Sequence, residues 1–206
     1  MEKFTNHVGL AVPLVKSNVD TELIIRIQRC AQLPRECLGP WAFESLRYFP
    51  DDQLDPECVF NNPAFEGASI LLAGENFGCG SSREWAVWAL AGMGLRCVIA
   101  PSFGDIFYAN CFQNGMLPIR LPAAAVQALS AQAVGGALVL EIDLPSQTIL
   151  GAVDGSIAFD IDPLRKSMLM RGIDEISMTL KYDHDITNWQ SRDFIKRPWA
   201  HASFQI

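Results

Sequence analysis

The feature that most constrains the fold is a set of three consecutive segments in the middle of the chain. Residues 67–73, GASILLA, form a continuous apolar run that begins at a glycine, which is typical of a buried strand. Residues 81–91 carry apolar side chains at helical spacing, and residues 96–100, RCVIA, form a second apolar run. A strand, helix and strand within so few residues predict a crossover between two parallel strands. The middle of the chain therefore indicates an α/β fold.

After this crossover, one more helix and strand continue the alternation. The C-terminal third then has strands followed by helices. We expect, in chain order, a helix over 104–112, a strand over 116–121, a half-buried strand over 138–144, a turn at Asp154 before a strand ending at Ile161, a helix from Pro163 to Gly172, and a last helix from Asp174 to about Ser191. Residues 32–66 are rich in proline, aromatic and acidic residues without periodicity. They predict a docking or substrate loop within one domain that spans residues 1–206.

Composition excludes several classes of function. The 206 residues carry a net charge of −7 and no run of Lys and Arg, so a nucleic-acid partner is disfavoured. The apolar runs are too short to cross a bilayer, and the N-terminus lacks a secretory pattern, so we expect a cytoplasmic protein without a membrane partner. None of the six cysteines forms a C-x-x-C pair, and there are three histidines. We expect reduced thiols and no metal bound by this chain.

The segment that indicates chemistry is GENFGCGSSREWAVWAL, residues 74–90. Its glycine-rich turn leaves a buried strand and enters a helix at Ser81 or Ser82. Free backbone N–H groups and the helix dipole favour an anion at such a helix start. The turn also follows the carboxyl end of a strand, where α/β sheets bind ligands. Arg83 adds a planar cation suited to a carboxylate.

A structural interpretation of the same residues remains open. Ser81 and Glu84 have the spacing of a capping box, which would only stabilise the helix start. The two interpretations are compatible, because a serine held among helix N–H groups has a stabilised alkoxide. The loop has neither pattern of a nucleotide-binding turn. Nearby, Trp85 and Trp88 predict core packing, and His184 predicts a helix-face residue with a local partner.

The loop resembles the signature of the aconitase-superfamily swivel domain, in the form N-F-G-C-G-S-S-R-E found in isopropylmalate isomerase small subunits. Other segments are similar to that family in the same order. They are Asn18–Ile25, Val98–Phe103, Asp105–Phe107, Asn110, Asn114, Leu117–Pro118, Phe159–Asp162, Arg165–Lys166, Gly172, Asp174 and Thr179–Leu180. The resemblance covers nearly the whole chain.

The resemblance implies a swivelling β/β/α fold with a mostly parallel central sheet, an added β-hairpin and C-terminal helices. It also implies a hydro-lyase that moves a hydroxyl between adjacent carbons by dehydration and rehydration, as isopropylmalate isomerase does in leucine biosynthesis. The [4Fe-4S] cluster of the reaction would lie in a large partner subunit, without which this chain is inactive, and the substrate would be a small dicarboxylate. Ser81 would be the catalytic base, Ser82 a hydrogen-bond donor to the substrate, and Arg83 its carboxylate ligand.

The resemblance further implies positioning roles for five residues around the loop, which are Gly78, Gly80, Glu84, Asp20 and Thr21. Arg35 stands where the family has an arginine in a variable loop, and from there it would reach the substrate, although a solvated loop charge explains it equally well.

Three departures keep the substrate open. Trp85 replaces a histidine, Arg26 and Ile27 replace a proline and a lysine, and Glu22 replaces an aspartate. A paralogue acting on another 2-substituted malate or maleate, or a non-catalytic anion-binding module, remains an alternative.

Overall fold

The computed structural model describes residues 1–80, 84–152 and 155–201. Contacts divide the chain into two compact units, Met1–Gly172 and Ile173–Ile206. The first unit contains the sheet and both hydrophobic clusters. The second unit is helical in its described part.

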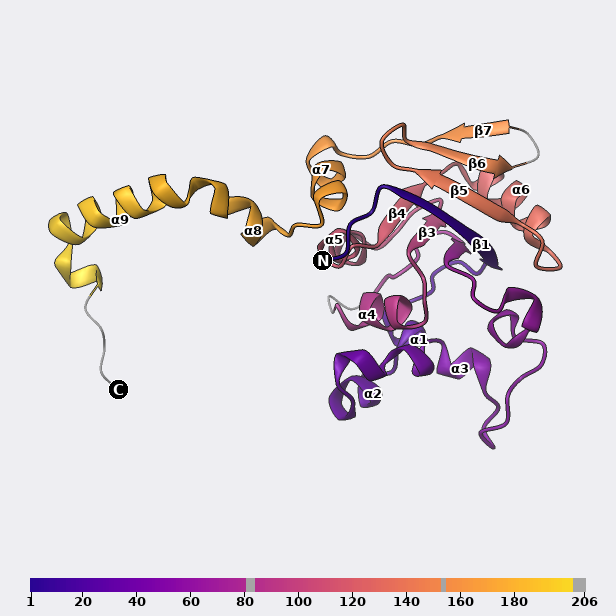
Figure 1. The fold of residues 1–206 in the computed structure, drawn as a ribbon. Helices are drawn as coiled ribbons and strands as arrows, with labels where there is room; N and C mark the ends of the chain where they lie inside the picture. The colour runs from indigo at the N-terminus through magenta and orange to yellow at the C-terminus, as the bar shows by residue number, and fades with distance from the viewer. Residues whose placement is uncertain (81–83, 153–154, 202–206) are drawn as a thin grey trace. The chain divides into compact units, whose positions relative to one another are not determined.

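The first unit is built on a seven-stranded sheet of order β4-β3-β2-β1-β5-β6-β7 (Figure 1). Neighbours among the first four strands pair in parallel, and the remaining pairs are antiparallel. The bounds are β1 Asn6–Leu14, β2 Ile70–Ala73, β3 Cys97–Ala100, β4 Leu117–Arg120, β5 Val139–Asp143, β6 Thr148–Ala152 and β7 Gly155–Ala158. The expected α/β fold, with parallel central strands, an added hairpin and C-terminal helices, is confirmed.

Helices cover both faces of the parallel strands, and Figure 1 shows α1 to α4 gathered below the sheet in that view. In the first unit the α-helices are α1 Thr21–Ile24, α2 Ile27–Gln32, α3 Glu44–Arg47, α4 Trp85–Gly92, α5 Asp105–Gln113, α6 Ala123–Ala133 and α7 Pro163–Arg171. Its 3-10 turns are η1 Arg35–Cys37, η2 Gly39–Trp41, η3 Val59–Asn61 and η4 Pro63–Phe65. The second unit has α8 Glu175–Thr179, η5 Leu180–Tyr182, α9 Asp183–Lys196 and η6 Pro198–His201.

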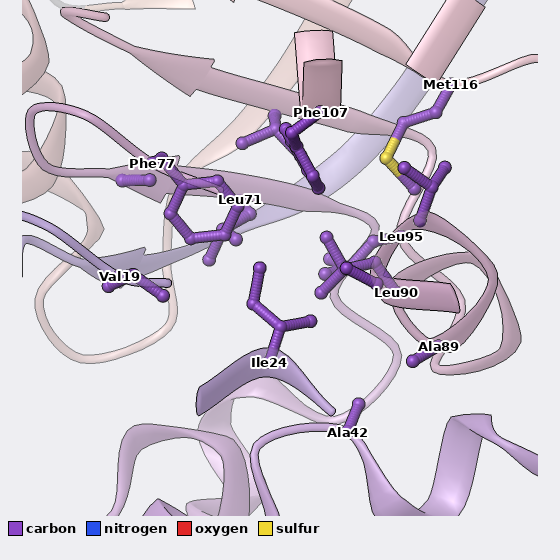
Figure 2. Packing of buried hydrophobic residues seen from close by; sticks show 14 of the residues in the cluster. Val19, Ile24, Ala42, Leu71, Phe77, Ala89, Leu90, Leu95, Phe107 and Met116 are labelled. Carbon is purple, nitrogen blue, oxygen red and sulfur yellow. The ribbon is translucent and has the colours of Figure 1, made fainter. Parts of the chain in front are cut away.

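The central strands are buried on both faces, which explains their unbroken apolar sequence. Side chains alternate along β2, so that Leu71 joins one cluster while Ile70 and Leu72 join the other. The cluster on the Leu71 side contains residues of α1, α4 and α5, as Figure 2 shows for Ile24, Leu90 and Phe107. The opposite cluster contains residues of α6 and α7. The sheet is therefore the middle layer of three.

Most of the expected elements are confirmed. The two central strands, the helix and strand that follow, and the alternating strand near residue 140 all form. Asp162 caps α7 by accepting the N–H groups of Leu164 and Arg165, and Gly172 ends that helix at a φ of 69°. The hairpin between β6 and β7 also forms, although Asp154 of its expected turn lies outside the described residues.

Three expectations were wrong or incomplete. Within the expected docking or substrate loop, 32–66, the structure forms α3 and four 3-10 turns that the sequence did not indicate. The last helix was expected to be continuous to about Ser191, but the 3-10 turn η5 separates α8 from α9, which continues to Lys196. Strand β1 and helix α6 were not anticipated.

The second unit presents many apolar side chains to solvent. Among its large apolar residues, Ile176, Ile195 and Trp199 are each more than two-thirds exposed. His184 bonds Asn188 at 3.0 Å, one turn away on α9, which confirms its expected local partner. In the described part of the chain, no helix combines the length and apolar character needed to span a membrane.

Candidate active site

The signature loop leaves β2 at the carboxyl edge of the parallel strands and is held on both sides by backbone hydrogen bonds. On one side, the N–H of Gly78 donates to the carbonyl of Val19 at 2.7 Å, and the N–H of Thr21 donates to the carbonyl of Cys79 at 3.0 Å. On the other side, the N–H of Phe77 donates to the carbonyl of Ser102 at 3.1 Å. The segments that follow β1, β2 and β3 thus lie side by side. This is the edge where parallel α/β sheets bind ligands.

Side chains at the start of the loop reinforce this arrangement. Asn76 donates from Nδ2 to Oδ1 of Asn18 at 2.8 Å, and its backbone N–H donates to Oγ of Ser102 at 2.9 Å. Asn18 and Asn76 have φ values of 55° and 56°, in the left-handed region that asparagine tolerates better than most residues. All three residues lie within segments of the resemblance but were not selected as site residues, although an asparagine before a glycine-rich turn is a signal for such a conformation.

Gly78 and Gly80 both have a positive φ, which an L side chain rarely adopts. A Cβ on Gly78 would lie 2.2 Å from Cγ of Phe107, so this position has no room for a side chain. Among the described residues, a Cβ on Gly80 would make ordinary contacts with Cβ of Asp20 at 3.5 Å and with Oγ1 of Thr21 at 3.9 Å. Residue 78 must therefore be glycine both because of its backbone conformation and because a side chain has no space there. Residue 80 must be glycine because of its backbone conformation.

Asp20 and Thr21 lie against the far end of the described loop. Asp20 is the N-cap of α1, where its carboxylate accepts the N–H of Leu23 at 2.7 Å. Thr21 is buried, and its backbone bonds Cys79 in the loop. The two residues thus bring the start of α1 next to the glycine turn.

Ser81, Ser82 and Arg83 lie outside the described residues, and the helix that was expected to begin at Ser81 or Ser82 is assigned as α4 from Trp85, with Glu84 as its N-cap. Glu84, which follows them, is half-buried, and Oε1 of its carboxylate accepts a hydrogen bond from Nδ2 of Asn114 at 3.2 Å. Trp85 and Trp88 are also half-buried and pack against the core, as expected.

Arg35 reaches the same group from the segment 32–66. Its Nη2 donates to Oδ1 of Asn114 at 3.1 Å, and its guanidinium carbon lies 4.8 Å from the centre of the Trp88 ring. The sequence placed Asn114 within the resemblance but did not select it as a site residue.

Two of the departures from the family pattern have local structural partners. The carboxylate of Glu22 accepts the backbone N–H of Ile27 at 3.1 Å, at the start of α2. Arg26 donates from Nε to Oγ of Ser45 at 3.1 Å. Glu22 thus stabilises the turn between α1 and α2, and Arg26 links that turn to α3.

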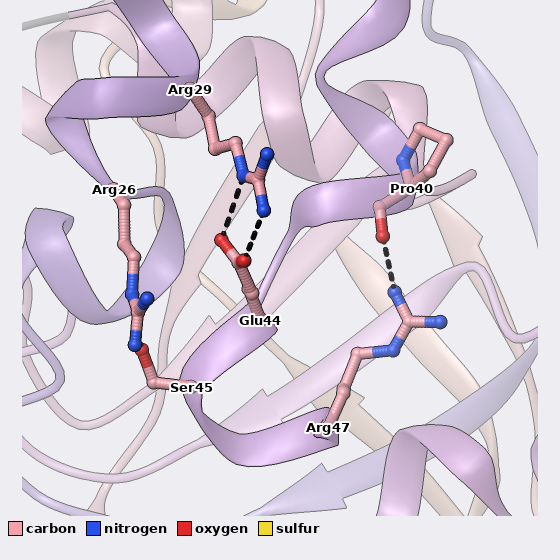
Figure 3. A network of polar contacts seen from close by, with 6 residues as sticks. All are labelled: Arg26, Arg29, Pro40, Glu44, Ser45 and Arg47. Atoms are coloured by element: carbon pink, nitrogen blue, oxygen red, sulfur yellow. Dashed lines mark hydrogen bonds and ion pairs between the residues drawn. The ribbon is translucent and has the colours of Figure 1, made fainter. Parts of the chain in front are cut away.

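A polar network orders the segment 32–66 (Figure 3). Arg29 forms a two-pronged ion pair with Glu44, and this hydrogen bonding lowers the pKa of the Glu44 carboxyl. Arg47 donates to the carbonyl of Pro40 at 2.9 Å. Aromatic residues suggested a docking surface here, but Phe43 is fully buried and stacks on Phe60 at 4.4 Å, so it belongs to the core.

A hollow of about 230 Å³ lies at the carboxyl edge beside the start of the loop, lined in part by Val15, Gly74 and Glu75. A larger one of about 320 Å³ is lined by residues at the opposite ends of the strands, including Gly67 and Leu95. Of these two hollows, the first is the one adjacent to the segments that hold the signature loop.

Comparisons with known proteins agree on one family. Residues 1–124 match the aconitase C-terminal domain. The chain is 47% identical over 201 residues to the 3-isopropylmalate dehydratase small subunit of Rhodopseudomonas palustris strain BisA53, which covers 97% of this chain and 100% of the relative. The corresponding small subunit of Paramagnetospirillum magneticum is 46% identical over 200 residues, covering 97% of this chain and 100% of that protein.

A solved structure of 3-isopropylmalate dehydratase from Methanocaldococcus jannaschii superposes with a TM-score of 0.63 at 26% identity, covering 91% of this chain and 99% of the other. The expected swivel fold is thereby confirmed. The chain belongs to the family of 3-isopropylmalate dehydratase small subunits, within the group that shares the aconitase C-terminal domain.

Proposed function

We propose that this chain is the small subunit of a 3-isopropylmalate dehydratase, which interconverts 2-isopropylmalate and 3-isopropylmalate by removing and re-adding water in leucine biosynthesis. The observation that carries the proposal is near-half identity, over almost the full length of both chains, to small subunits of that name. The intact Ser-Ser-Arg motif supports a catalytic rather than a purely binding role.

Ser81 is proposed as the base that removes the C–H proton next to a substrate carboxylate. A neutral serine is a usable base only if its alkoxide is stabilised by N–H donors and positive charge. Ser82 is proposed to donate a hydrogen bond to the substrate, and Arg83 to bind a carboxylate with both prongs of its guanidinium. Positive charge at Arg83 also favours a carbanion-like intermediate beside that carboxylate.

The neighbouring residues are proposed to position this motif. Gly78 and Gly80 supply the left-handed backbone conformations that lead into it. The backbone N–H of Thr21 bonds Cys79 of the same turn, and Asp20 lies opposite Cys79. Arg35 is proposed as a further contact to the substrate, with its guanidinium already oriented by Asn114.

The iron–sulfur cluster of the reaction is proposed to lie in the large subunit, where it supplies a Lewis acid. The described residues of this chain do not fit such a cluster, because no three His, Cys, Asp or Glu side chains among them gather into a possible metal site. Cys97 and Cys111 are fully buried, and burial raises the pKa of both thiols, which disfavours the thiolate that a cluster needs.

A large partner subunit is proposed to complete the active site, docking in part on residues 32–66. Trp41 and Tyr48 of this segment remain partly exposed, which suits an interface. The substrate is proposed to be a small dicarboxylate that occupies the space between the two subunits. We place the enzyme in the cytoplasm, since its six cysteines, all within the described residues, are thiols rather than disulfides, as is typical of a reducing compartment.

Reconstitution tests the proposal. The chain would be combined with the large subunit of the same organism and assayed against 2-isopropylmalate and a panel of other 2-substituted malates and maleates. We expect the highest kcat/KM with isopropylmalate and no turnover by either subunit alone. A higher kcat/KM for another member of the panel would identify a paralogue, and no turnover with any member would favour an anion-binding module.

A further inference from the structure

The side chain of Asn114 joins three segments that are distant in the sequence. It lies at the C-terminal end of α5 and is half-buried. Its Oδ1 accepts from Nε1 of Trp88 at 2.8 Å and from Nη2 of Arg35 at 3.1 Å. Its Nδ2 donates to Oε1 of Glu84 at 3.2 Å and to the carbonyl of Asn110 at 2.9 Å. One amide therefore contacts α4, α5 and the segment 32–66.

The chemistry of the partners fixes the orientation of this amide. Trp88 and Arg35 can only donate, so the atom facing them must be the oxygen of Asn114. The nitrogen then faces the Glu84 carboxylate and a carbonyl, which can only accept. Both lone pairs and both N–H groups of the amide are used.

The position of Glu84 connects the Asn114 amide to the candidate active site. Glu84 directly follows the Ser-Ser-Arg motif, and Trp88 lies one turn further along α4. A side chain that holds both of them fixes the start of the helix that the motif enters. The same amide holds Arg35, and the guanidinium also lies against the Trp88 ring at 4.8 Å.

We propose that Asn114 is a positioning residue for the dehydratase reaction, holding the start of α4 and the Arg35 guanidinium in one hydrogen-bonded unit. The proposal rests on the function proposed above. Asn114 does not touch the reacting atoms in this role, and its effect is transmitted through Glu84 and Arg35.

Variants that exchange the hydrogen-bond donor and acceptor between residues 114 and 84 test the proposal. Asn114→Asp would oppose two carboxylates at the 3.2 Å contact with Glu84, so kcat/KM of the reconstituted enzyme should fall by about tenfold or more. Lowering the pH should partly restore it, because one carboxyl of a close pair binds a proton readily. Adding Glu84→Gln should restore at least threefold of the lost activity, since the amide introduced at residue 84 donates to the carboxylate introduced at residue 114, while the contact with the carbonyl of Asn110 stays lost. Gln113→Glu is the control, because it adds the same charge at an exposed neighbour.

Two kinetic results would overturn the proposal. The first is an Asn114→Asp enzyme no slower than the Gln113→Glu control, and the second is a double variant no better than Asn114→Asp alone. Hydrogen exchange of residues 84–92, measured in the isolated chain, distinguishes failure of the positioning role of Asn114 from failure of the proposed function. Exchange should accelerate in Asn114→Asp and return part of the way to normal in the double variant, even if the wild-type pair does not turn over isopropylmalate. Unchanged exchange in Asn114→Asp would contradict the proposal.

Discussion

Replacing Gly78 with alanine tests whether the signature loop needs both a left-handed backbone and an empty space. The backbone φ is 73°, which costs an L residue about 1–2 kcal/mol. The added Cβ would also lie 2.2 Å from the Phe107 ring. That ring cannot easily move, because it is buried and packs edge-on against Phe77 at 5.4 Å. Overpacking of this kind costs about 1–3 kcal/mol more.

Gly67→Ala is a matched control. Gly67 has almost the same φ, 74°, and a Cβ there would meet no atom within 4 Å. The difference between the two variants therefore isolates the contact with Phe107. We expect Gly78→Ala to lower the free energy of unfolding by about 2–5 kcal/mol and Gly67→Ala by about 1–2 kcal/mol. For a chain of this size, the first loss corresponds to a melting temperature lower by about 4–20 °C.

Denaturant unfolding of both variants, followed by circular dichroism, measures these costs. Introducing Phe107→Leu should cost less in the Gly78→Ala background than in the wild type, since the smaller side chain relieves the overlap. Equal costs for Gly78→Ala and Gly67→Ala, within about 0.5 kcal/mol, would refute the steric argument.

Three further outcomes are expected. Burial, together with the nearby Arg96, lowers the pKa of His7 from 6.5, so the folded state disfavours the charged imidazole. The free energy of unfolding should fall as the pH drops below 6.5, and His7→Gln should flatten that part of the pH profile; an unchanged profile would contradict this. Ser130→Ala should raise the free energy of unfolding by about 1 kcal/mol, because the buried hydroxyl has no hydrogen-bond partner among the described residues. A loss of stability would reveal a missing partner. Adding the large subunit should slow hydrogen exchange in residues 32–66, and an unaffected segment would place the interface elsewhere.

The sequence predicted best those elements whose burial can be recognised from their own residues. Strands β2 and β3 have every residue buried, so their apolar runs are unbroken and bounded by turns. Strand β1 was missed because few of its residues are fully buried and it contains Gly9 and Pro13. Helix α6 begins with three alanines and has only weak periodicity, although Val126 and Leu129 are buried against the sheet.

The residues of the candidate site also fall into those that the sequence indicated and those that it did not. The glycines of the loop and the pair Asp20 and Thr21 could be selected from the family motif, and the structure brings them together by short backbone bonds. Asn114 could not be selected as a positioning residue, because its proposed role depends on three segments meeting in the folded chain. The burial of Phe43 was also missed, since a segment without periodicity does not indicate which of its aromatic side chains point inward.

The most direct test of the proposed mechanism is the kinetics of Ser81→Ala in the reconstituted enzyme, with the melting temperature measured on the same samples. If Ser81 is the base, the Michaelis constant and the melting temperature should stay near wild type, while kcat falls by about a hundredfold or more. If Ser81 has only a structural role, the variant should lose about 1 kcal/mol of stability and keep a normal kcat. A destabilised enzyme with normal turnover would contradict the assignment of Ser81 as the catalytic base.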